Sequence, residues 1–159
     1  YIYYDRETNE ICISRDILGN TGFIQKNIVS ALGIYLLIAH EFGHAFEELW
    51  KLTISQEEQE GFADIFSGYA FRNAYTGNNL SMEQVVGALL VYEELWTICR
   101  EMEERFGTKN IYGNENVRVK NFLTGYMMTP QKFASYIEQF AQTKEGIKSF
   151  KNLLLSILR

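Results

Sequence analysis

The sequence predicts an α+β domain that is mainly α-helical and carries a small β-hairpin at its N-terminus. The opening residues are aromatic and β-branched on both sides of a polar turn, which is typical of a hairpin. From about residue 24 onward, apolar residues recur at helical spacing. Because the 159 residues contain no linker and no internal repeat, we expect a single domain over residues 1–159, with about five to six helices.

The N-terminal hairpin is expected in the stretch "YIYYDRETNEICISRDIL", with its turn around Glu7 to Asn9. A loop, "GNTG", follows and leads into a long helix predicted from about Ile24 to Trp50. Part of the buried face of that helix is formed by four residues at helical spacing: Ile28, Leu32, Tyr35 and Leu36.

Capping signals predict where the next two helices begin. The segment "SQEE", Ser55 to Glu58, is a capping box and predicts a second helix from about Gln56 to Tyr75. The segment "SMEQ", Ser81 to Gln84, repeats the pattern and predicts a third helix that ends near Phe106.

Three further helices are expected in the C-terminal part. A "GTKNIYGN" loop precedes a fourth helix, which starts near Asn114. Thr129 before Pro130 marks another start, because proline is tolerated in the first helical turn. The last helix, about Glu145 to Leu158, has an apolar packing face made of Ile147, Phe150, Leu153, Leu154 and Ile157.

Charge and composition exclude several classes of protein. The formal net charge of -5 and the scattered basic residues argue against nucleic-acid binding and against an anionic membrane surface. No apolar run approaches the roughly 20 residues of a membrane span, so we expect no membrane contact within this segment.

The two cysteines, Cys12 and Cys99, match no redox or zinc-ribbon motif, although one disulfide is possible. Because the chain starts at Tyr1, we expect a processed or trimmed piece of a longer protein.

The stretch "LLIAHEFGHAFEELW" contains the only two histidines of the chain. His40 and His44 lie one helical turn apart, so both imidazoles project from one face and can bind one metal ion, for which zinc is the expected choice. Glu41 lies on the same turn, where its carboxylate can take a proton from a metal-activated water. H-E-x-x-H on a helix therefore predicts metal-assisted hydrolysis.

The alternative is a chance match, in which both histidines are ordinary helix residues. Gly43 argues against it, because glycine inside a helix costs about 1 kcal/mol relative to alanine. Such a residue indicates that another element approaches the helix closely at this point.

A catalytic zinc needs three protein ligands and an open position. No third histidine exists, so the third ligand must be a carboxylate or a cysteine, and the metzincin pattern is excluded by count. Glu48 lies eight residues after His40, about 12 Å along the helix axis, and is expected to be solvated. The carboxylates on the next helix are better placed, and a less favoured option is Cys12 or Cys99.

Glu60 is the predicted third ligand. Glu60 and Asp64 share one helix face, and the small residues in "EGFADIFSGYA" allow another helix to approach closely. Asp64 is then placed to accept the second ring N–H of a zinc-bound histidine and to fix its tautomer. The alternative is that "QEEQE" is a solvated acidic face, which is our expectation for Glu57 and Glu58.

Three segments resemble the neutral zinc metallopeptidases, a family within the gluzincins, whose third zinc ligand is a glutamate. These are "AHEFGHAFEEL", the ExxADxFxGxxA pattern that begins at Glu60, and "YGNENVRVKNFLTGY". The resemblance covers much of the chain from Ala39 to Tyr126, and its third segment is the least specific. Similar continuations occur in metallopeptidases that cleave phage-type repressors, but no DNA-binding segment accompanies them here.

The resemblance implies that His40, His44 and Glu60 bind zinc and that Glu41 is the general base. By the same resemblance, Asp64 supports the ligands without binding the metal itself. It also implies a zincin-like fold and the activity of a zinc-dependent endopeptidase, with a peptide or protein as substrate. The family further suggests a parent chain that is membrane-tethered or exported.

Two catalytic assignments come from the third segment. Arg118 matches the arginine of the family, and its alternative is an ordinary salt-bridged helix residue. Tyr112 stands where the family has a histidine; its hydroxyl could stabilise an oxyanion, or it could be a core or loop aromatic. By analogy with zincin-like folds, the "EICIS" strand is the candidate edge for binding an extended peptide.

Two other classes of function remain as alternatives. One is a catalytically silent zinc-binding regulatory or interaction domain of metallopeptidase ancestry, which the intact Glu41 disfavours. The other is a structural helical domain without a metal. The substrate, the cleavage preference and the oligomeric state do not follow from the motifs.

Overall fold

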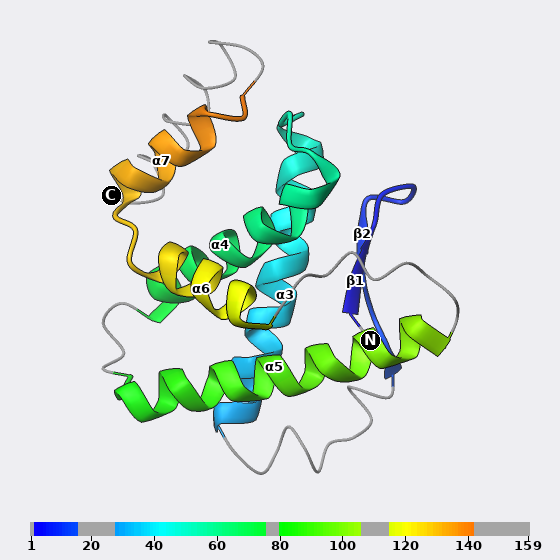
Figure 1. Ribbon diagram of the computed structural model, residues 1–159, viewed down its shortest axis with the longest axis vertical. Coiled ribbons are helices and arrows are strands. Elements are labelled where there is room, and N and C mark those ends of the chain that lie inside the picture. Colours follow the sequence, from blue (N-terminus) through cyan, green and yellow to red (C-terminus); the bar gives the residue numbers. More distant parts are fainter. Residues whose placement is uncertain (1, 16–27, 76–79, 106–114, 142–159) are drawn as a thin grey trace.

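Five α-helices and a two-stranded antiparallel sheet make up the part of the chain that the computed structural model describes (Figure 1). The described residues are 2–15, 28–75, 80–105 and 115–141. This arrangement confirms the predicted class, mainly helical α+β. In these ranges, no helix has the length and apolar character that a membrane crossing requires.

The hairpin consists of β1 (Ile2–Asp5) and β2 (Glu10–Ile13). At the turn, Asp5 Oδ1 accepts hydrogen bonds from the backbone N–H groups two and three residues further on. Asn9 has a φ of 58°, a left-handed conformation that asparagine tolerates better than most residues. The turn therefore lies where the sequence predicts it.

The helices follow in chain order as α3 (Ile28–Leu49), α4 (Gln56–Tyr75), α5 (Met82–Arg105), α6 (Glu115–Tyr126) and α7 (Pro130–Glu138). Their starts confirm the predicted caps. The N–H of Ser81 donates to Gln84 Oε1, and the N–H of Gln84 donates to Ser81 Oγ, which completes a capping box for α5. Thr129 Oγ1 likewise accepts from the first turn of α7. The predicted last helix, residues 145–158, lies outside the described residues.

Helix α3 runs through the middle of the structure, with α4 and α5 packed against it and α6 packed against α4 (Figure 1). One buried cluster lies around α3 and includes the predicted Leu32 and Leu36 with Phe71 of α4. A second joins α4 to α7, where the rings of Tyr69 and Phe133 stack 3.8 Å apart. Because each fully buried side chain of this size contributes about 1.5–3 kcal/mol, both clusters fix the position of α4.

Close helix contacts depend on three glycines at two crossings. A Cβ at Gly43 would lie 2.7 Å from Cα of Ala63, so the predicted close approach to α3 is confirmed, and the approaching element is α4. On the other side of α4, a Cβ at Gly68 would lie 2.0 Å from the carbonyl oxygen of Phe122, and Gly125 faces α4 in the same way. Helix α4 is therefore held tightly between α3 and α6, which brings polar side chains of all three helices together.

Candidate metal centre

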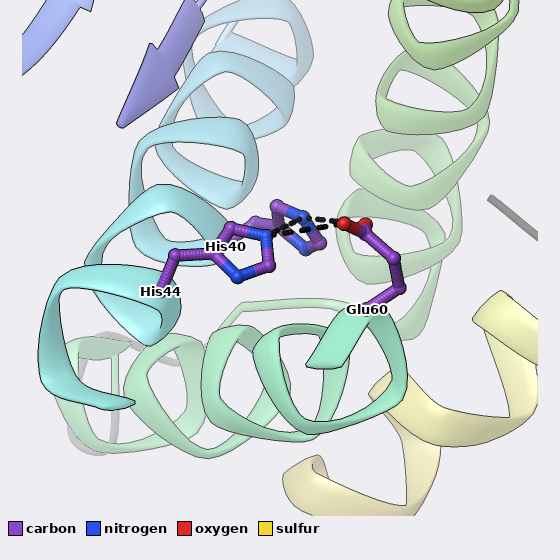
Figure 2. Close-up of side chains that lie close together, drawn as sticks. All are labelled: His40, His44 and Glu60. Carbon is purple, nitrogen blue, oxygen red and sulfur yellow. Dashed lines mark hydrogen bonds and ion pairs between the residues drawn. The ribbon is translucent and has the colours of Figure 1, made fainter. Parts of the chain in front are cut away.

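His40 and His44 on α3 point toward Glu60 on α4 (Figure 2). Their Nε2 atoms are 3.2 Å apart. Glu60 Oε2 lies 3.2 Å from Nε2 of His40, and Glu60 Oε1 lies 3.4 Å from Nε2 of His44. One ligand atom from each residue falls within 4.8 Å of the others. The fold therefore brings together the three residues that the sequence predicts as ligands.

The outer ring nitrogen of His40 faces a buried polar network. Nδ1 of His40 lies 3.0 Å from Asp64 Oδ1. The hydroxyl of Tyr92, on α5, donates to the same oxygen at 2.9 Å, and Arg118 Nη2, on α6, donates to it at 2.6 Å. One carboxylate oxygen thus gathers donors from α3, α5 and α6, and this charge-assisted network locks the His40 ring in one orientation.

Arg118 lies beside Asp64 and Glu60. It is only 5% exposed, and besides Asp64 it approaches Glu60 Oε2, which is 3.6 Å from its Nη1. Its guanidinium also lies over the ring of Tyr92, 5.8 Å from the centroid. The burial and these partners make Arg118 part of the network that supports His40 and Glu60.

Glu41 contacts the hairpin. It is 6% exposed, and its Oε2 accepts a hydrogen bond of 2.7 Å from the backbone N–H of Tyr4. The strand whose backbone reaches Glu41 is therefore β1. The "EICIS" strand includes β2, which pairs with β1, and its role as the edge that binds an extended peptide stays a prediction.

The charges of the site shift the pKa values of its members strongly. Burial alone would lower the pKa of His44, but the carboxylates of Glu47 and Glu60 outweigh it and raise the pKa to about 10. The pKa of His40 is also raised, because Asp64 and Glu60 overcome its burial. Burial raises the pKa of Glu41, although both histidines oppose that shift. For Glu60, the two histidines overcome burial and hold the pKa well below its usual range.

Four carboxylates gather around the two imidazoles, and among the described residues the charges of Arg118 and, toward Glu47, of Arg6 oppose them. The carboxylates belong to Glu41, Glu47, Glu60 and Asp64, and all four interact with a histidine. With both imidazoles neutral, the centre carries an excess of buried negative charge. Such an excess is costly unless protons or a cation compensate it.

Other predicted residues fall into three groups. Glu48 and Glu58 are exposed, as expected for solvated carboxylates. Cys12 is a half-buried free thiol and does not belong to the ligand group found among the described residues. Tyr112 lies outside the described residues, as do the side chains of Glu57 and Cys99.

Sequence reasoning missed three participants in the site. Tyr92 comes from α5, far along the chain, and no local pattern distinguishes it from the other tyrosines. The backbone N–H of Tyr4 carries no side-chain signal at all. Glu47 could have been found, because it follows His44 by three residues on the same helix face.

Compared with known protein families, with curated proteins and with solved structures, the chain matches none. The class of the site therefore rests on its own residues, namely two histidines and a carboxylate around one point.

Proposed function

We propose that this protein is a zinc-dependent metalloendopeptidase whose metal ligands are His40, His44 and Glu60. The observation that carries the proposal is the convergence of these three side chains from α3 and α4. Tetrahedral zinc with bonds of about 2.0–2.1 Å separates its ligand atoms by roughly 3.3 Å. The Nε2 atoms of His40 and His44 are 3.2 Å apart, which is close to that spacing. Each has one Glu60 oxygen beside it, Oε2 at 3.2 Å from His40 and Oε1 at 3.4 Å from His44, and one ligand atom from each residue falls within 4.8 Å of the others.

Two further features of the site support a cation. Glu60 Oε2 is buried and completes no hydrogen bond with any described residue, as expected of an atom that faces a metal. The excess of carboxylates also matches a divalent ion. When bound, zinc supplies Lewis-acid chemistry, which lowers the pKa of a water molecule and polarises a carbonyl group.

Glu41 acts as general base in this proposal. Its carboxylate lies on the turn of α3 that carries both histidines, and the N–H of Tyr4 holds one of its oxygens in place. Burial raises the pKa of Glu41, which makes its carboxylate a better proton acceptor than an exposed glutamate. Glu41 therefore takes the proton of the attacking water and returns it to the leaving amine.

Asp64 and Arg118 support the ligands. Asp64 accepts the Nδ1–H of His40 and so directs Nε2 toward the metal, an arrangement common in zinc sites. Arg118 and the hydroxyl of Tyr92 hold Asp64 in turn. The motif resemblance to the neutral zinc metallopeptidases and their zincin-like fold belongs to the same proposal, in which Tyr112 stabilises the oxyanion.

A peptide-library cleavage assay tests the proposed activity. The zinc-loaded protein is expected to cleave internal peptide bonds, to lose that activity with a chelator and to regain it when zinc is restored. Mass spectrometry of the products would reveal the cleavage sites. If no peptide is cleaved although zinc is bound, the endopeptidase assignment fails.

One observation favours a second candidate, a catalytically silent zinc-binding domain. His40 is 1% exposed, and β1 covers Glu41, so the described conformation offers a substrate little access to the base. Such a domain would bind zinc with the same ligands and cleave nothing. The two candidates therefore differ in turnover and agree on the metal.

Zinc binding is expected to release protons at pH 8, where an ordinary histidine is almost fully deprotonated. The metal-free protein keeps His44 protonated at pH 8, because its pKa is raised to about 10. Since zinc requires a neutral imidazole, binding at pH 8 should release about one proton from His44, against roughly 0.03 from a histidine with the usual pKa of about 6.5. Zinc affinity should consequently fall about tenfold for each pH unit below 10 through the His44 proton alone.

Calorimetry in buffers of different ionisation enthalpy measures that release directly. A release below about 0.1 proton per bound zinc at pH 8 would contradict the claim that the neighbouring carboxylates raise the pKa of His44.

A further inference from the structure

Glu47 is a buried carboxylate that the proposed reaction does not use. It lies on α3 one turn after His44 and is 6% exposed. Neither of its carboxylate oxygens completes a hydrogen bond with a described residue. Because a buried charge without a hydrogen bond is costly, its presence indicates a specific role.

A buried nitrogen of His44 indicates that role. Glu47 Oε1 lies 3.5 Å from Nδ1 of His44, which is itself buried and completes no hydrogen bond in the described part of the chain. Two buried polar atoms that lack hydrogen bonds thus face each other. The other ring nitrogen of His44 faces His40 and Glu60, the other two proposed ligands.

His40 shows the same arrangement in a completed form. Its Nε2 faces the proposed metal position, while its Nδ1 lies 3.0 Å from Asp64 Oδ1. Each of the two histidines therefore has a carboxylate on its outer nitrogen. The carboxylate of His40 comes from α4, and that of His44 comes from its own helix.

We propose that Glu47 is the positioning residue of His44. Its carboxylate accepts the Nδ1–H of His44, selects the tautomer with a free Nε2 and holds that nitrogen toward the metal. A carboxylate in this position also makes the imidazole a stronger ligand. The inference rests on the proposed metal site and gives Glu47 a role that neither the HExxH motif nor the roles implied by the family resemblance include.

Neighbouring glutamates provide a matched test. Two variants, Glu47→Gln and Glu47→Met, are compared with the control Glu48→Gln. The control makes the same glutamate-to-glutamine change at the neighbouring position, which is exposed. Zinc affinity is measured by competition with a chromophoric chelator at pH 7.5. We expect Glu47→Met to bind zinc about 10–100-fold more weakly than wild type, Glu47→Gln to lie in between, and Glu48→Gln to stay within twofold.

A spectroscopic measurement separates positioning from a merely structural role. The chain has only two histidines, so a long-range ¹H–¹⁵N spectrum of the zinc-loaded protein contains only two imidazoles. In wild type, both Nδ1–H protons should be detected with the shifts of hydrogen-bonded groups. In Glu47→Gln, which keeps an acceptor in a folded protein, only the signal of His44 should move.

The outcomes distinguish this inference from the metal site itself. If wild type binds zinc and both Glu47 variants bind it within twofold of wild type, the role of Glu47 is overturned and the metal site stands. If wild type binds no zinc, both proposals fail together.

Discussion

Replacing Glu41 by glutamine is expected to leave zinc binding intact and to reduce peptide hydrolysis by about 10²–10⁴-fold, the usual contribution of a general base. Glutamine keeps the shape of the side chain and can still accept the hydrogen bond from the N–H of Tyr4. It cannot take a proton from water. The expected result is therefore a lower kcat with the metal content of wild type.

The structure explains why this variant should remain folded. Glu41 does not belong to the His40–His44–Glu60 group, and its burial makes a neutral side chain easier to accommodate than a charged one. Glu48→Gln, on the exposed face of the same helix, is the matched control and should cleave like wild type. Equal cleavage by Glu41→Gln and wild type would remove the catalytic claim and leave the silent zinc-binding domain as the better interpretation.

Loss of Asp64 is expected to have the largest effect on stability. Asp64 is 1% exposed, and its replacement by asparagine leaves the buried guanidinium of Arg118 without a compensating charge at 2.6 Å. Breaking a buried pair in this way typically costs about 3–5 kcal/mol. Urea unfolding of the chelated protein measures this cost without any contribution from zinc.

A double variant shows whether the pair is the cause. Asp64→Asn combined with Arg118→Met removes both charges, so it should be less destabilising than the sum of the two single variants. The interpretation fails if the losses of unfolding free energy in the two single variants simply add in the double variant. It also fails if Asp64→Asn costs less than about 1 kcal/mol, because the Asp64–Arg118 pair would then not stabilise the site.

Local patterns in the sequence predicted the helix that carries the histidines and the residues that begin the other helices. The reason is that capping and one-turn spacing depend on residues within one turn of each other. His40 and His44 share a face for this reason, and Ser81 with Gln84 caps α5 as expected.

The position of Glu60 was predicted by combining spacing with packing. Gly43 indicated a close approach to the first helix, and the small residues after Glu60 indicated which helix makes it. The crossing of α3 and α4 at Ala63 agrees with both indications.

Contacts between elements that are distant in the chain were not predictable in this way. Tyr92 reaches Asp64 only because α5 packs across α3, and the N–H of Tyr4 reaches Glu41 only because of where the hairpin lies. These contacts depend on tertiary packing, which is set by the summed burial of many side chains rather than by a motif.

Metal content is the measurement that tests the central claim most directly. Wild type and Glu60→Ala are purified side by side, supplied with zinc, freed of excess metal and examined by elemental analysis. We expect about one zinc per wild-type chain, because three ligands with an open position form a catalytic zinc site, and clear loss of zinc from the variant. Wild-type protein that holds no zinc after it has been supplied would contradict the hydrolase assignment and the ligand role of His40, His44 and Glu60.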